Sequence, residues 1–162
     1  MSSFFPRIIS LLPSATEIVC ALGLESNLVG ITHECDFPVT VADLTHVTSS
    51  RISHQKLTSA EIDHAVRSQL DGHGSIYDLD QEKLRKLKPD VIITQELCEV
   101  CAVTYKTVEK AAKICASAAE IISLEPNTIE DIFENILTVG KVCGVGERAL
   151  KLVEALKKRI ET

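Results

Sequence analysis

The sequence predicts a Rossmann-like, three-layer α/β lobe whose mostly parallel sheet has about five strands. Short runs rich in β-branched residues alternate along the chain with segments of helical periodicity, and this alternation is typical of β-α-β units. The length of 162 residues is that of one domain. In chain order, the expected strands are Arg7–Leu12, Leu28–Thr32, His46–Thr48, Asp90–Thr94 and Glu120–Leu124.

The first two expected helices begin at capping boxes. Ser14 and Glu17 stand three residues apart, so each side chain can bond a backbone N–H of the opening turn. Gly23 then supplies the end of that helix. Thr58 and Glu61 have the same spacing and predict the start of a second helix.

The later helices are predicted from one further cap and from apolar stripes. Asp80 caps a short helix, which has to end before Pro89. Two stripes then recur at helical spacing: Val108, Ala111, Ala112 and Cys115, followed by Ile129, Ile132, Phe133, Ile136 and Leu137. An amphipathic helix closes the chain, so we expect a binding lobe over residues 1–144 and a carboxyl-terminal helix over residues 145–162.

Composition and hydropathy exclude some partners and favour one location. The net charge is −6, and the sequence has no basic stripe that could neutralise a phosphate backbone, so no nucleic-acid partner is expected. The first apolar run, Ile8–Leu12, is stopped by Pro13 and is shorter than the roughly 7–15 residues of a signal peptide core. No stretch approaches the ~18 apolar residues of a transmembrane segment. These features favour a cytoplasmic protein with reduced cysteines.

Two segments carry a resemblance to a known family. The first, residues 7–30, contains the run Pro13-Ser14-Ala15-Thr16-Glu17 after an apolar strand, and the second, residues 84–94, contains Leu87-Lys88-Pro89-Asp90 before one. Together with the order of the other elements, they resemble the amino-terminal lobe of the helical-backbone periplasmic substrate-binding proteins, the cobalamin and iron-chelate type that serves ABC importers. The resemblance covers nearly the whole chain, apart from an expected insertion at residues 51–75.

The resemblance implies a ligand and a way of binding it. Members of the family hold the ligand in a cleft between two lobes, and this chain has the length of only one. By resemblance, the ligand is cobalamin or another metal chelate, contacted by Pro13, Ser14, Ala15, Thr16 and Glu17. A glutamate shortly before the Lys-Pro-Asp turn docks such lobes onto the transporter, and Glu82 stands at that place here. The alternative for Glu82 is a solvated glutamate favoured by the helix dipole.

The residues themselves indicate a second kind of site. His33 and Cys35 follow the second expected strand, and Cys98 and Cys101 follow the fourth. Because the carboxyl ends of parallel strands meet at one edge, we expect all four side chains to converge there. One imidazole and up to three thiolates suit zinc, or iron as another thiophilic ion. The alternative is that the cysteines are small buried hydrophobes and that His33 is a hydrogen-bonded loop residue.

A binding module is therefore the main hypothesis, with two rivals. One rival is an enzyme that uses the Cys98 and Cys101 loop, either for thiol redox chemistry or for metal-assisted hydrolysis with Glu34 or Glu96 as the base. The sequence contains no defensible arrangement of nucleophile, base and acid, so this reading ranks second. The other rival is a shortened product without independent function.

The last helix predicts an association surface. Leu150, Val153, Leu156 and Ile160 lie close to one face. In two-lobed relatives the corresponding helix is covered by both lobes, and one lobe provides only half of that cover. An exposed apolar stripe favours association, so we expect a homodimer or a second-lobe partner bound through this helix.

Overall fold

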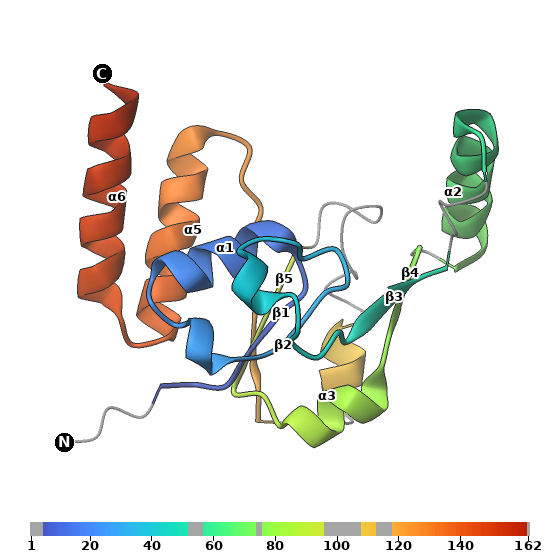
Figure 1. Ribbon diagram of the computed structural model, residues 1–162, viewed down its shortest axis with the longest axis horizontal. Coiled ribbons are helices and arrows are strands. Elements are labelled where there is room, and N and C mark those ends of the chain that lie inside the picture. The colour runs from blue at the N-terminus through green and yellow to red at the C-terminus, as the bar shows by residue number, and fades with distance from the viewer. Residues whose placement is uncertain (1–4, 52–56, 74–75, 96–107, 113–117, 162) are drawn as a thin grey trace.

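A parallel sheet of four strands forms the centre of the protein in the computed structural model, which describes residues 5–51, 57–73, 76–95, 108–112 and 118–161 (Figure 1). The strands are β1 (Ile8–Ser10), β2 (Leu28–Ile31), β5 (Val91–Thr94) and β6 (Glu120–Ser123), in the spatial order β2-β1-β5-β6. Ile8 pairs with Leu28 on one side and with Val91 on the other. Each strand lies within its predicted range, and the predicted fold class is confirmed.

Helices cover both faces of the sheet. They are α1 (Pro13–Ala21), α3 (Gln81–Leu87), α5 (Ile129–Val142) and α6 (Gly146–Ile160), and residues 108–112 are also helical. Because successive side chains of a strand point to opposite faces, Ile8 and Ile93 pack with α1, α5 and α6, whereas Ile9 and Ile92 pack with α3 and residues 108–112. The result is the predicted three-layer arrangement.

The turn between β1 and α1 differs from its prediction at the cap. The N-cap residue is Leu12, and Pro13 occupies the first helical turn, where its missing N–H is not needed. The expected capping box of Ser14 and Glu17 is therefore wrong by two positions. The predicted end of α1 is confirmed, since Gly23 adopts φ 72° and donates its N–H to the carbonyl of Cys20 at 2.9 Å.

A two-stranded antiparallel ribbon leaves the sheet after β2 and carries a helix of its own. The ribbon consists of β3 (Thr48–Ser50) and β4 (Tyr77–Leu79), and the helix is α2 (Ser59–His73). Figure 1 shows α2 standing apart from the sheet at the far end of the ribbon. The predicted third strand is only partly correct, because His46 forms a single bridge to Ile31 before the ribbon begins. The predicted cap of α2 is confirmed by the Thr58 N–H, which donates to Glu61 Oε2 at 2.7 Å.

The last helix is part of the lobe's own core. α5 and α6 lie side by side (Figure 1), and Ala149 and Val153 of α6 are buried against the same cluster as β1. A methyl group added at Gly140 of α5 would overlap the methyl group of Ala149, so the two helices meet at their backbones. Leu150 and Ile160 remain 62% and 60% exposed. The predicted apolar stripe therefore divides between the core and the surface.

Candidate functional site

The carboxyl edge of the sheet brings two of the expected loops together. β1 runs into the turn at Pro13, and β2 runs into the turn at His33. The backbone N–H of Thr32 donates to the carbonyl of Ser10 at 2.9 Å, which holds the two strand ends side by side. Because α1 begins at this edge, its unpaired backbone N–H groups and the positive end of its dipole lie there too.

Buried hydroxyl and thiol groups fix the two turns to each other. The Thr16 hydroxyl donates to Ser10 Oγ at 2.8 Å and lies 3.0 Å from Cys35 Sγ. Thr16 and Ala15 are fully buried beneath the turn. Of the five residues expected to contact ligand, Ser14 and Glu17 are exposed and Pro13 is half-buried. These three side chains are the ones that reach the surface.

A hollow of about 270 Å³ opens beside this turn. It lies between α1 and α5, next to the end of β6, and Ser14, Glu17 and Asn135 give it polar groups. The rest of the lining is apolar and consists of Ile18, Leu124, Pro126 and Ile132. An apolar wall with a few polar groups is the usual lining of a ligand site. The hollow therefore joins two of the predicted contact residues to a surface of suitable chemistry.

His33 lies where the β2 turn meets the ribbon. Its Nδ1 is 2.7 Å from Thr48 Oγ1, and the same hydroxyl accepts a hydrogen bond from the His33 backbone N–H at 3.1 Å. Its Nε2 is 3.2 Å from Glu34 Oε1. Tyr77 packs edge-on against the imidazole, with 5.2 Å between ring centroids, and burial, followed by the charge of Glu34, raises the pKa of its hydroxyl. Thr48 and Tyr77 were not predicted as site residues, because nothing local in the sequence shows that the ribbon returns to His33.

Only one of the three predicted thiolate ligands, Cys35, lies among the residues that the structure describes. Cys98 and Cys101 lie outside the described residues, so the four-ligand site remains a prediction. Burial raises the pKa of the Cys35 thiol, which favours the protonated form. His33 contacts the ribbon, whereas Cys35 contacts α1. Within the described part of the chain, His, Cys, Asp and Glu side chains alone form no group of three or more that could hold a metal ion.

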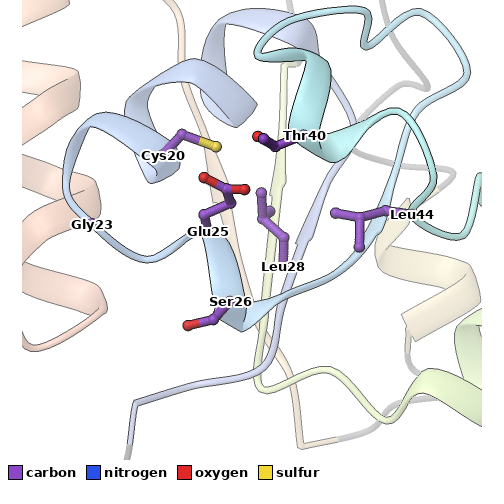
Figure 2. A pocket seen from close by; sticks show the side chains of 7 residues that line it. All are labelled: Cys20, Gly23, Glu25, Ser26, Leu28, Thr40 and Leu44. Atoms are coloured by element: carbon purple, nitrogen blue, oxygen red, sulfur yellow. The ribbon is translucent and has the colours of Figure 1, made fainter.

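A larger hollow, of about 570 Å³, lies away from the carboxyl edge (Figure 2). Its lining includes Gly23, Ser26 and Leu28, which stand at the end of α1 and the start of β2. Burial, followed by the charge of Glu25, raises the pKa of the Cys20 thiol beside it to about 11. A thiol with that pKa stays protonated at neutral pH and is a poor nucleophile. Size alone therefore does not make this hollow the site.

The predicted docking residue is accessible. Glu82 lies in the first turn of α3; its side chain is 81% exposed, and its carboxylate is 3.8 Å from Lys86 Nζ. A pair this exposed holds the side chain only weakly. Docking through Glu82 remains a prediction.

Comparisons with known proteins agree on one family. Residues 8–162 match the family described as periplasmic binding protein. An uncharacterised ABC transporter substrate-binding lipoprotein of Bacillus subtilis, YvrC, is 26% identical over 140 residues, which make up 83% of this chain and 43% of that protein. The chain thus spans about half the length, or less, of the relatives it matches.

Two solved structures share the fold. The periplasmic vitamin B12-binding protein BtuF of Vibrio cholerae superposes with a TM-score of 0.64 at 24% identity, over 96% of this chain and 49% of that one. The periplasmic heme-binding protein HutB of the same organism gives a TM-score of 0.66 at 19% identity, over 96% and 48%. At these identities, the likeness establishes the fold alone.

The predicted cytoplasmic location is contradicted by these comparisons. The matching family is periplasmic, and the relatives are periplasmic proteins or a lipoprotein, all outside the cytoplasm. The prediction rested on the first residues of the sequence, and these are weaker evidence of cellular location than the family to which the chain belongs. Among the described helices, none combines the length and the apolar character needed to cross a membrane. The family match covers residues 8–162, so the chain belongs to the periplasmic binding protein family.

Proposed function

We propose that the chain is a ligand-binding lobe of an ABC importer's substrate-binding protein, and that it contacts a metal chelate at the carboxyl edge of its sheet. The observation that carries this proposal is the meeting of the two turns at that edge. Ser14 and Glu17 line the hollow on one side of β1, and His33 and Glu34 follow β2 on the other. The names of similar proteins supply the ligand class, cobalamin or heme.

The size of the hollow supports contact with part of a chelate. Ligand pockets that enclose a drug-sized molecule have roughly 300–1,000 Å³, and the hollow at Ser14 has about 270 Å³ and is open. One lobe therefore covers one face of a large planar ligand. A second lobe, or a second copy of this chain, would cover the other face and supply most of the remaining affinity.

A pair of matched substitutions tests the location. Ser14→Tyr places a ring over the edge hollow, and Ser26→Tyr places the same ring in the larger hollow at the other end of β2. Both serines are exposed, so neither change disturbs the core. Titration with cyanocobalamin and with hemin, followed by visible absorbance, should show binding weakened about tenfold or more by Ser14→Tyr. Binding that is weakened by Ser26→Tyr instead, or absent for both chelates in the parent protein, would refute the proposal.

The thiolate site is a second candidate, proposed from residue type and chain position. We infer that Cys98 and Cys101, with His33 and Cys35, bind zinc or iron. Support comes from the adjacency of the β1 and β2 ends, which places His33 at the expected edge. Protein purified without chelator should contain stoichiometric metal, and Cys98→Ser with Cys101→Ser should remove it while the domain stays folded. Equal metal content in the mutant and the parent would contradict the shared site.

A further inference from the structure

Two neighbouring hollows near the end of α1 differ in the chemistry of their walls. The hollow of about 570 Å³ in Figure 2 has polar groups from Glu25, Ser26 and Thr40. A second hollow, of about 500 Å³, is formed by α1, α5, α6 and the turn at Phe37-Pro38, and most of its wall is apolar. Cys20 and Glu25 line both hollows, so the two lie next to each other. A molecule that occupies both needs one polar end and one apolar end.

The polar hollow carries negative charge. Figure 2 shows the Glu25 carboxylate, the Cys20 thiol and the Thr40 hydroxyl turned toward one another. Burial, and then the charge of Glu25, raises the pKa of the Cys20 thiol to about 11, so the thiol is uncharged at neutral pH and the carboxylate supplies the charge of the group. Glu25 forms no ion pair with any of the residues that the structure describes. Its carboxylate, beside a hydroxyl that also accepts hydrogen bonds, suits a cation that carries N–H groups.

The neighbouring hollow suits an aliphatic chain. Leu152 and Leu156 of α6 contribute to its wall together with Ala21 of α1, and both leucines are only partly buried. An alkyl chain laid against this wall removes apolar surface of the ligand and of the protein from water. The charged groups of the lining are two carboxylates and one guanidinium, so its net charge is negative as well. Both hollows have the volume of ordinary ligand sites, roughly 300–1,000 Å³.

We propose that the two hollows together bind an amphipathic aliphatic amine, whose ammonium group pairs with Glu25 and whose alkyl chain lies against Leu152 and Leu156. The ammonium group donates hydrogen bonds to the Glu25 carboxylate and to the Thr40 hydroxyl. An anionic amphiphile with the same chain is repelled by Glu25, so the site selects its ligand by charge as well as by chain length. The site does not depend on the proposed chelate function, because Glu25 and Thr40 are not part of the edge hollow at Ser14.

Calorimetric titration with matched ligands tests the two ends of the molecule separately. The probe is n-octylamine, n-butylamine shortens the chain, and octanoate reverses the charge. We expect n-octylamine to bind at least tenfold more tightly than n-butylamine, because each buried methylene group contributes up to about fourfold. Octanoate should not bind in the same concentration range. A parent protein that does not bind n-octylamine, or binds octanoate equally well, would overturn the proposal.

A matched pair of substitutions tests the role of the carboxylate. Glu25→Gln keeps the shape of the side chain and removes its charge, and it should lower the affinity for n-octylamine about three- to tenfold. Glu130→Gln removes the same charge from an exposed position in the first turn of α5 and should leave the affinity unchanged. Equal losses in the two variants would show that net charge attracts the amine, and the proposed site would then be wrong.

A further variant tests the position of the alkyl chain. Ala21 is exposed and lines the apolar hollow, so Ala21→Tyr fills that hollow without entering the core. The variant should remove most of the difference in affinity between n-octylamine and n-butylamine. A difference as large as that of the parent would refute the placement of the chain. Binding of cyanocobalamin should be the same in Glu25→Gln and the parent, and a parent that binds the amine but no chelate would count only against the proposed function.

Discussion

Thr16 Oγ1 lies 3.0 Å from Cys35 Sγ, and this buried contact ties the first turn of α1 to the turn after β2. The same hydroxyl donates to Ser10 Oγ at 2.8 Å, so one side chain connects three segments beneath the candidate site. Ser10 and Thr16 are fully buried and Cys35 nearly so. The position of the two site turns relative to each other therefore depends on a small polar cluster inside an apolar core.

Removing the Thr16 hydroxyl should destabilise the protein more than removing its methyl group. Thr16→Val keeps the shape of the side chain but removes the donor to Ser10 Oγ, which still donates to the Leu12 carbonyl, and the buried partner of Cys35 Sγ, at about 1–3 kcal/mol. Thr16→Ser keeps the hydroxyl and removes one methyl group, at about 1 kcal/mol. Urea unfolding followed by far-UV circular dichroism measures both values. A Thr16→Ser variant less stable than Thr16→Val would show that packing, and not hydrogen bonding, determines stability here.

A second stability prediction concerns the contact between α5 and α6. Gly140→Ala would place a methyl group on that of Ala149, which is part of the helix and cannot rotate away. We expect a loss of about 1–3 kcal/mol from overpacking, larger than the gain of up to ~1 kcal/mol in helix propensity. Gly146→Ala is the matched control, because its new methyl group meets open space. Thermal unfolding should separate the two variants clearly, and equal midpoints would disprove the close contact.

The sequence predicts the sheet well because its two central strands, β1 and β5, consist mainly of buried apolar residues. Ile8, Ile9, Ile92 and Ile93 are all fully buried, and strands covered on both faces need no alternation of polar and apolar residues. The ribbon is harder to predict, since β4 has only three residues and pairs with β3 across a long insertion. Pairing over that distance depends on tertiary contacts that no local pattern contains.

The candidate site divides in the same way. Chain position alone places Ser14 and His33 at one edge, because both follow parallel strands. The burial of Thr16 was not foreseen, since a threonine in a first turn is as compatible with ligand contact as with an internal hydrogen bond. Tyr77 was missed because it approaches His33 only through the ribbon. Local signals thus find the edge, and the packing decides which side chains reach it.

Alkaline pH should reveal the burial of Cys143. Burial, and then the charge of Glu120, raises the pKa of this thiol from 9.0 to about 11. Between these values the unfolded chain loses the thiol proton and the folded chain keeps it, so stability is intact below pH 9 and falls as the pH rises toward 11. Over this pH range the free energy of unfolding of Cys143→Ala should fall less steeply with pH than that of the parent. The difference in slope should correspond to at most about one proton bound by the folded chain and not by the unfolded chain. Identical slopes in both proteins, from urea unfolding at each pH, would show that the thiol does not contribute.

The surface of α6 leads to a prediction about association. Leu150 and Ile160 are 62% and 60% exposed, about 15 Å apart along the helix axis, whereas Val153 between them is 7% exposed and packs inside the lobe. An exposed pair of large apolar side chains on a straight helix can be covered by the same helix of a second copy. We therefore expect a dimer in light scattering at micromolar concentration. Leu150→Glu combined with Ile160→Glu should give a monomer with unchanged circular dichroism, because neither side chain is part of the core.

Two control variants of α6 show whether a change in association comes from Leu150 and Ile160. Ala155→Glu adds a charge at an exposed position on another face of α6 and should leave the dimer intact. Leu156→Glu replaces a side chain that packs partly against the lobe, so it should lower the unfolding midpoint whether or not the protein associates. A parent protein that is monomeric at every concentration would mean that α6 completes its own lobe. In that case the exposed Leu150 and Ile160 would be isolated surface residues, which are common on monomeric proteins.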